Sequence, residues 1–243
     1  MLRNIKLEIE YDGTNFHGWQ MQPKLRTVQR EIQEKLETIL GHEVNLIGAG
    51  RTDVGVHALG QVANFETTSK LAQNSIMNGL NGLLPGDIAI KEIEEVDLDF
   101  NSRYWAKSRL YNYRIHLGKS AILRNYVWEV LYSLNLENIF RATKKIQGKH
   151  DFSSFCVAES TKDNNVCHVF SAHWEKSGDE RIFKIEADRF LHTMARSLVG
   201  TFIEVGRGYF SVSDFVNIME AKDRKKAGPT APACGLYLVK IEY

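Results

Sequence analysis

The sequence has few of the features that mark secreted or metal-stabilised proteins. Its 243 residues include only three cysteines, Cys156, Cys167 and Cys234, and none of them forms a C-x-x-C pair. An odd number of cysteines argues against a disulfide framework. A zinc site would have to use Cys167 with His168 and His173, but residues 166–174 alternate as a strand does. We therefore expect no structural metal.

Long apolar runs are also missing. No apolar stretch reaches the roughly 18 residues that cross a bilayer, and the N-terminus lacks the basic-then-apolar pattern of a secretory signal. Apolar residues make up 43% of the chain and charged residues 25%, which is typical of a globular protein. We expect a cytoplasmic protein without a membrane-spanning segment.

A net charge of +1 does not by itself indicate a nucleic-acid partner, but the charge is unevenly distributed. Residues 1–105 hold 10 Lys and Arg against 15 Asp and Glu, whereas residues 106–243 hold 21 against 15. Residues 106–149 carry nine basic and two acidic side chains, interleaved with Tyr111, Tyr113, Tyr126, Trp128 and Tyr132. Such a stretch suits a polyphosphate with stackable bases, or equally a solvated helix beside a tyrosine-rich strand.

Periodicity predicts alternating strands and helices in the first half. Strands are expected over 7–11, 44–47, 61–67 and 88–93, and helices over 27–40 and 71–84. Thr27 is the expected N-cap of the first helix, which shows Val28, Ile32 and Leu36 on one face and Gly41 as its stop. This half therefore has the order βαββαβ.

The second half has a similar order. Strands are expected over 102–117, 166–175, 181–188 and 235–243, and helices over 136–147, 191–205 (ended by Gly206) and 212–221. Two βαββαβ halves predict an α+β, ferredoxin-like fold with largely antiparallel sheets. We place the boundary between a subdomain at 1–105 and a second at 106–243.

The strongest chemical signal is the loop Gly48-Ala49-Gly50-Arg51-Thr52-Asp53-Val54-Gly55-Val56-His57-Ala58 between two expected strands. Glycine allows positive φ and close approach of the backbone to a ligand. A single Asp beside an Arg can act as a nucleophile or base without a cofactor. Taken alone, Arg51 and Asp53 could equally be an ordinary ion pair that fixes the loop.

Other interpretations of this loop are weaker. A dinucleotide fingerprint would need a third glycine where Asp53 stands and a helix after it. The chain has no G-x-x-x-x-G-K-[ST] loop for a nucleoside triphosphate. A metal site at Asp53 and His57 would have too few ligands. An RNA-binding protein without catalysis remains an alternative, but a phosphate binder gains nothing from an anion in this loop.

The loop Gly50-Arg51-Thr52-Asp53-Val54-Gly55-Val56-His57 resembles the G-R-T-D-x-G-V-H motif of the tRNA pseudouridine synthase A family. Further segments are similar to other motifs of that family and follow in the expected order: Glu10-Tyr11-Asp12-Gly13, Phe16-x-Gly18-Trp19-Gln20, Gly60-Gln61-Val62, Asn81-Gly82-Leu83-Leu84-Pro85-Gly86-Asp87-Ile88, Asp151-Phe152-Ser153-Ser154-Phe155, Met194-Ala195-Arg196-x-x-Val199-Gly200 and Gly235-Leu236-Tyr237-Leu238. The resemblance spans nearly the whole chain. It implies the pseudouridine synthase fold.

The resemblance also implies a role for five residues. Asp53 matches the catalytic aspartate, Tyr111 the tyrosine that packs against the target base, and Arg196 the arginine that pairs with the aspartate. Leu236 matches an apolar residue of the pocket wall, and Arg51 a loop arginine that helps to hold the flipped-out nucleotide. Leu110, Asn112 and Ala195 depart from the residues usual in relatives, which puts local RNA contacts in doubt rather than the chemistry.

The implied reaction converts uridine to pseudouridine at positions 38, 39 and 40 of the tRNA anticodon stem-loop. The family acts as a homodimer and needs neither cofactor nor metal. The sequence does not choose whether Asp53 attacks C1′, attacks C6 or removes the C2′ proton.

Overall fold

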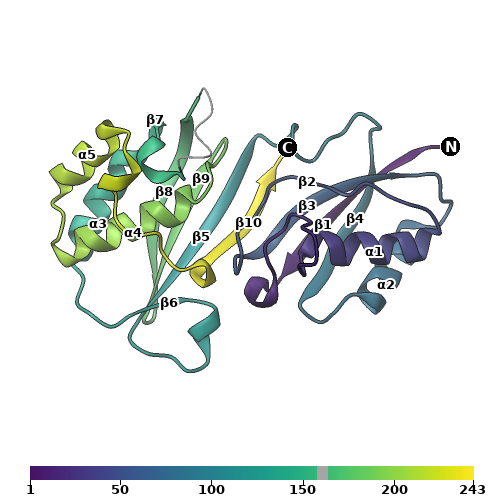
Figure 1. The fold of residues 1–243 in the computed structure, drawn as a ribbon, viewed down its shortest axis with the longest axis horizontal. Coiled ribbons are helices and arrows are strands. Elements are labelled where there is room, and N and C mark those ends of the chain that lie inside the picture. The colour runs from purple at the N-terminus through teal and green to yellow at the C-terminus, as the bar shows by residue number, and fades with distance from the viewer. Residues whose placement is uncertain (158–163) are drawn as a thin grey trace. The chain divides into compact units, whose positions relative to one another are not determined.

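The computed structural model describes residues 1–157 and 164–243, which form two compact units (Figure 1). The first unit comprises Met1–Lys107 together with Tyr237–Tyr243, and the second comprises Ser108–Leu236. The terminal strand, which the sequence analysis counted with the second half, pairs in parallel with a strand of the first unit, Tyr237 opposite His57. The first unit is therefore discontinuous in sequence.

The sheet of the first unit has the strand order β4-β1-β3-β10, with the two-residue β2 beside β3. Its strands are β1 (Arg3–Tyr11), β2 (Ile47–Gly48), β3 (His57–Thr67), β4 (Ile88–Val96) and β10 (Leu236–Glu242). All pairs except β10 with β3 are antiparallel. Leu7 stands opposite both Ala63 and Ile93. The buried side chains of β1 alternate as the sequence predicts, because successive side chains point to opposite faces.

Two helices pack on this sheet, α1 (Val28–Leu40) and α2 (Gln73–Leu83). Figure 1 shows both on the same side of the strands. Val28, Ile32 and Leu36 of α1 are buried, and the helix ends at Gly41 in the left-handed region (φ 72°), as predicted. Thr27 is the N-cap, but its buried hydroxyl makes no capping bond. The absence of a side chain at Gly79 of α2 makes room for Ile39, which would lie 3.1 Å from an added Cβ.

The second unit contains a sheet of order β5-β9-β8-β7, with β6 parallel beside β5. Its strands are β5 (Ser108–Leu117), β6 (Trp128–Val130), β7 (Gly148–Asp151), β8 (Val166–Ser177) and β9 (Glu180–Ala187). The predicted strand across Cys167, His168 and His173 is confirmed as β8. The short strands β6 and β7 were not predicted.

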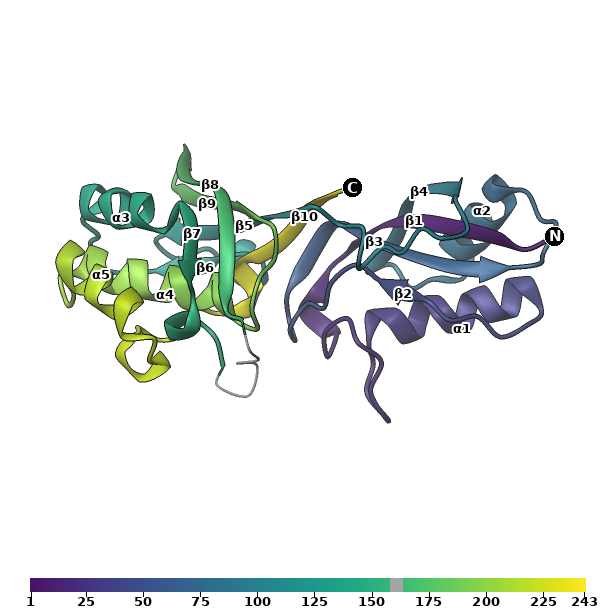
Figure 2. The ribbon, with the colours of Figure 1, turned by 90° about the horizontal axis from the view of Figure 1, so that it is seen from above.

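Three helices cover one face of this sheet: α3 (Leu136–Thr143), α4 (Met194–Arg207) and α5 (Val212–Ala221) (Figure 2). Their core is built on phenylalanine rings. The centroid of Phe202 lies 5.0 Å from that of Phe215 and 5.5 Å from that of Phe183. Asn135 caps α3 as predicted, and Ser211 caps α5 through a reciprocal bond with Asp214.

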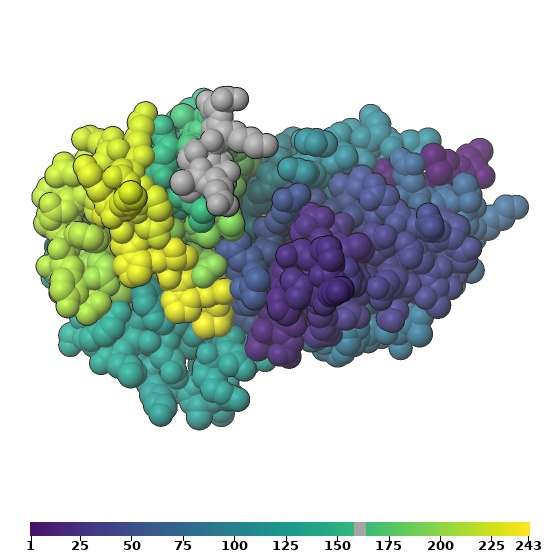
Figure 3. Space-filling view, in the orientation of Figure 1, coloured from purple at the N-terminus to yellow at the C-terminus, as the bar shows by residue number. Residues whose placement is uncertain are grey.

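Short 3-10 segments complete the described chain, at Gly13–Asn15, Leu123–Asn125, Lys144–Ile146, Ser153–Phe155, Arg224–Lys226 and Ala233–Gly235. Figure 3 shows the segment after α5, coloured yellow, on the surface of the second unit. The predicted helix over 136–147 instead ends at Thr143 and tightens into one of these segments.

Several other boundaries differ from prediction, and the strand expected over 44–47 is reduced to Ile47–Gly48. Two of the differences have identifiable reasons. The strand expected from 102 begins at Ser108, because the Asn101 side chain accepts hydrogen bonds from the backbone N–H groups of Arg103 and Tyr104 and forms a turn there. Gly206 does not stop α4. An added Cβ there would lie 2.6 Å from Ile139 Cδ1, so this glycine serves the packing of α3 on α4, and the helix ends at Gly208 (φ 82°).

Candidate active site

The loop that contains Asp53 is bonded to β3 at its start and closed by a turn at its end. At its start, Ala49 N–H donates to the Val62 carbonyl (2.8 Å), and the buried Gln61 amide donates to the Gly50 carbonyl (3.0 Å). At its end, Val56 N–H donates to the Asp53 carbonyl (3.2 Å), closing a turn with Gly55 at φ 77°. A turn of this kind favours glycine at its third position. The glycines thus shape the loop around Asp53.

Burial alternates along the chemical part of the loop. Arg51 is exposed, Thr52 is buried and Asp53 is half-buried. Asp53 is therefore partly exposed, whereas the residue before it is buried. Arg51 and Asp53 both belong to the first unit. A carboxylate on a fixed loop is suitable for a nucleophile or a base.

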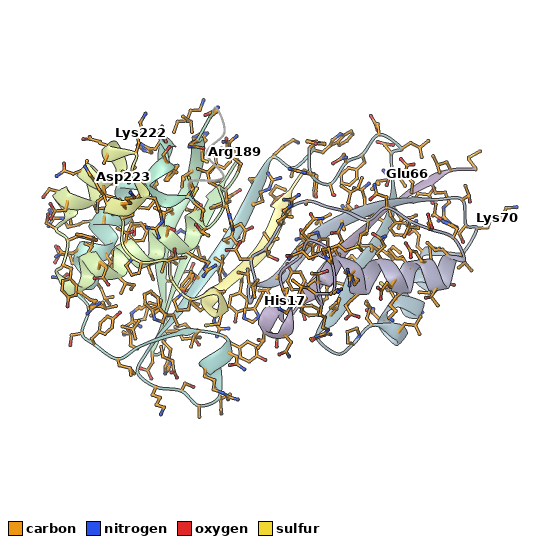
Figure 4. All side chains as sticks on the ribbon, viewed as in Figure 1. His17, Glu66, Lys70, Arg189, Lys222 and Asp223 are labelled. Carbon is orange, nitrogen blue, oxygen red and sulfur yellow. The ribbon has the colours of Figure 1, made fainter. Side chains whose placement is uncertain are left out.

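The segment from Asp12 to Gln20 supports this loop from the side. Trp19 N–H donates to the Thr52 carbonyl (3.2 Å), and Gly55 N–H donates to the Phe16 carbonyl (3.4 Å). His17, labelled in Figure 4, is exposed in the middle of the segment. The function of this segment was not predicted beyond its family likeness, and the structure shows it in direct contact with the loop that contains Asp53.

Two glycines of this segment are needed for that contact. A Cβ on Gly13 would lie 2.0 Å from the Val56 carbonyl oxygen. A Cβ on Gly18 would lie 2.5 Å from the Thr52 carbonyl oxygen, and Gly18 has φ 82°. Only glycine permits both this approach and this backbone conformation. These contacts join residues far apart in sequence, so spacing alone could not reveal them.

An ion pair holds the supporting segment in place. Arg26 donates to both carboxylate oxygens of Asp87 (2.8 and 2.9 Å), and its guanidinium lies 4.2 Å from the Phe16 ring centre. The hydrogen bonds to Asp87 raise the pKa of Arg26, so the guanidinium stays charged. The Asp87 carbonyl also accepts from Asp12 N–H (3.0 Å). Arg26 is a supporting residue that the sequence analysis missed.

His57, considered above as a metal ligand, has a packing role instead. Its ring is buried, stacks on Tyr237 with centroids 4.7 Å apart, and accepts from Gly13 N–H at Nδ1 (3.1 Å). Within residues 1–157 and 164–243, no group of three or more His, Cys, Asp or Glu side chains could hold a metal ion. In the same ranges, no helix is long and apolar enough to cross a membrane.

The other three predicted site residues belong to the second unit. Tyr111 lies in β5 opposite Ile185, with 9% of its surface exposed, and meets the Phe190 ring edge-on at 4.8 Å. Tyr113, two residues on, is fully buried, and its hydroxyl donates to the Pro232 carbonyl (2.7 Å). Tyr113 is therefore a core residue, and not one of the stacking residues suggested by the basic stretch.

Arg196 is the third residue of α4 and is half-buried. Its Nε donates to the Ala231 carbonyl (2.8 Å), and Ala231 N–H donates back to the Arg196 carbonyl (3.1 Å). Burial raises the pKa of Tyr113 well above its usual value, and the nearby Arg196 charge acts in the opposite direction. Arg196 is thus held at its stem and directed by its backbone partner.

The segment that contains Ala231, the partner of Arg196, packs closely against α4. A Cβ on Gly200 would lie 1.7 Å from the Pro229 carbonyl oxygen, and Gly228 N–H donates to Thr201 Oγ1 (3.0 Å). Leu236, 7% exposed, follows at the end of the same segment. Arg196 and Leu236 were predicted from the sequence, whereas residues 228–231, which contact α4, were not.

Comparisons with known proteins agree with the motifs. A family described as tRNA pseudouridine synthase matches residues 8–105 and 142–243, so Tyr111 lies between the two matched stretches. Proteins named tRNA pseudouridine synthase A are similar along the whole chain. The protein from Caldicellulosiruptor saccharolyticus is 47% identical over 244 residues, covering 100% of both chains. That from Acetivibrio thermocellus is 46% identical with the same coverage, and that from Exiguobacterium sp. is 42% identical over 242 residues, covering 98% of its own length. With such matches along its full length, the chain belongs to the tRNA pseudouridine synthase family.

Proposed function

We propose that the protein isomerises uridine to pseudouridine in the tRNA anticodon stem-loop, at positions 38, 39 and 40, and that Asp53 is its catalytic carboxylate. The observation that carries the proposal is the half-buried Asp53 on a loop fixed by β3 and by residues 12–20. Relatives named tRNA pseudouridine synthase A, matched over the full chain, support the substrate.

The reaction requires rotation of a base that is normally stacked. The nucleotide must leave the helix, at a cost of a few kcal/mol. The N1–C1′ bond then breaks, the uracil turns, and a C5–C1′ bond forms, while C5 loses a proton and N1 gains one. No atom enters or leaves overall. In this reaction, Asp53 acts as a nucleophile at C1′ or C6, or as the base that removes the C2′ proton.

Four further residues take the roles that the family motifs imply. Arg51 holds the displaced nucleotide, and Arg196 keeps the aspartate ionised. Tyr111 stacks on the base, and Leu236 supplies an apolar wall. Stacking tolerates rotation of the base, which the reaction needs. We also propose that the Tyr111 phenol assists removal of the C5 proton. Unchanged turnover in Tyr111→Phe would exclude that assistance and leave the stacking role in place.

The test of the central claim is Asp53→Asn. The change preserves shape and removes the negative charge, so turnover should fall on the order of 10⁴-fold or more, while tRNA binding persists. Unmodified tRNA is incubated with the protein, without added metal or cofactor, and pseudouridine is mapped by carbodiimide treatment and primer extension. Glu66→Gln is the matched control, because Glu66 is an exposed carboxylate of the same unit, on β3 (Figure 4).

Each outcome separates the candidate functions. Substantial isomerisation by Asp53→Asn would refute the catalytic role. Binding of tRNA without isomerisation by the wild-type protein would instead favour a non-catalytic RNA-binding protein. The proposal further includes a cytoplasmic homodimer, and sedimentation of the purified protein tests the dimer.

A further inference from the structure

Tyr11 is the last residue of β1, in the middle of the first unit's sheet. It stands opposite Ala58 of β3 and Ile88 of β4, so its backbone is held from both sides. Its side chain is 3% exposed, and the Trp19 ring lies 6.2 Å from its own. From the sequence, Tyr11 was predicted to end a strand and to belong to a family motif. A tyrosine hydroxyl buried in such a place normally requires a partner.

That hydroxyl is directed at the catalytic loop. Tyr11 Oη and Thr52 Oγ1 share a hydrogen bond of 2.7 Å, and Thr52 is 7% exposed. Because both groups are shielded from water, the bond is stronger than a surface contact and costly to leave unmade. Thr52 is the residue immediately before Asp53.

Thr52 is held at two points of different kinds. Tyr11 holds its side chain, and Trp19 N–H holds its carbonyl (3.2 Å). With side chain and backbone both fixed, the peptide plane that leads into Asp53 has little freedom. The turn from Asp53 to Val56 and the contact at Gly18 fix the following peptide.

We propose that Tyr11 is a positioning residue for the isomerisation, and that its hydroxyl sets the position of the Asp53 carboxylate through Thr52. This inference rests on the proposed function of Asp53. A displacement of a reacting group by about 1 Å is enough to cost on the order of 10²-fold in rate. Loss of the Tyr11 hydroxyl should therefore lower kcat about 10-fold or more, with little change in KM or in tRNA affinity, because neither Tyr11 nor Thr52 is exposed to a ligand.

The experiment uses the full chain and four variants around this bond. Tyr11→Phe and Thr52→Val each remove one hydroxyl, and the double variant removes both. Thr52→Ser keeps the hydroxyl and removes only the methyl group. Tyr243→Phe is the matched control, since it removes a tyrosine hydroxyl that donates to the Ser102 carbonyl (2.9 Å) in the same unit, away from the loop. The measurements are kcat, KM, tRNA affinity and the unfolding midpoint.

The expected result is a fall in kcat for Tyr11→Phe and Thr52→Val, with a double variant no worse than either single variant. Thr52→Ser and Tyr243→Phe should retain kcat within about twofold, the order of the uncertainty in comparing such variants. Additive losses in the double variant, or losses in kcat that match the folded fraction, would show that Tyr11 only stabilises the fold and would overturn the inference. So would unchanged kcat in Tyr11→Phe.

Failure of the inference is distinguishable from failure of the proposed function. If wild-type protein forms no pseudouridine, or if Asp53→Asn remains active, the proposed function fails first. If wild type is active, Asp53→Asn is inactive and Tyr11→Phe turns over normally, only the positioning role fails.

Discussion

Thr193, the N-cap of α4, has a backbone conformation that its side chain disfavours. Its φ and ψ are 65° and 2°, in the left-handed region. There, a Cβ costs roughly 1–2 kcal/mol, and a β-branched residue is a genuine outlier. Replacement by Asn, which tolerates this region, should therefore stabilise the protein by about 1 kcal/mol.

The loss that accompanies this change is small. Ser197 Oγ donates to Thr193 Oγ1 at 3.4 Å, which is long for such a bond. Thr193→Gly should gain less than Thr193→Asn, because glycine loses about 0.5–1 kcal/mol more entropy on folding. For a chain of this size, 1 kcal/mol corresponds to a rise in Tm of roughly 2–4 °C.

The assay is thermal unfolding followed by circular dichroism, supported by urea titration at 25 °C. Lys24→Asn is the matched control, because the exposed Lys24 has φ 61° without a β-branch and should gain less. Activity should be unchanged in Thr193→Asn, since the backbone at α4 stays where it is. A lower midpoint for both Thr193 variants would refute the strain argument.

Further predictions concern a glycine, a carboxylate and a thiol. Gly18→Ala should destabilise the protein by about 2 kcal/mol or more in urea titration. In the control Gly41→Ala, an added Cβ meets nothing within 4 Å, so the only loss of stability should come from the left-handed backbone conformation. Equal losses in the two variants would contradict a clash at Thr52. Burial opposes ionisation of Asp151, but hydrogen bonds from Ser153 and the Lys222 ammonium (3.0 Å; Figure 4) lower its pKa below 3.8. A lowered folded-state pKa means that this contribution to stability is complete above about pH 4 and is lost as the pH falls through the lowered value, so Asp151→Asn should flatten the acid limb of the stability profile. Burial also raises the pKa of the Cys234 thiol, so at pH 8 iodoacetamide should label Cys234 more slowly than free cysteine, and labelling at an equal rate would contradict the burial.

Local signals in the sequence predict most of the helices and strands. They do not predict which distant segments contact one another. The apolar stripe of α1 and the glycine at 41 specify that helix nearly residue by residue. The order of strands and helices in the first unit also follows from periodicity. By contrast, periodicity assigns β10 no partner, because pairing with β3 depends on register and not on composition.

The candidate site shows the same division. Asp53, Arg196 and Leu236 were predicted from motifs. The residues that support the Asp53 loop, and those that contact Arg196, were not predicted to have a supporting role. Gly18, Arg26 and Ala231 act through backbone approach, an ion pair and a carbonyl group, respectively. None of these contacts leaves a spacing signal, since each partner lies in a different part of the chain.

The pairing of β10 with β3 has a consequence for biosynthesis. A nascent chain emerges from the ribosome N-terminus first, and its domains generally fold as they appear. The first unit cannot complete its sheet in this way, because its last strand is made only after the second unit. His57 must wait for Tyr237 before its ring is stacked. Pairing of β10 with β3 is also slow, because contacts between segments far apart in the chain are costly to form. The parallel pairing of β10 with β3 is therefore among the last contacts of the first unit to form during translation.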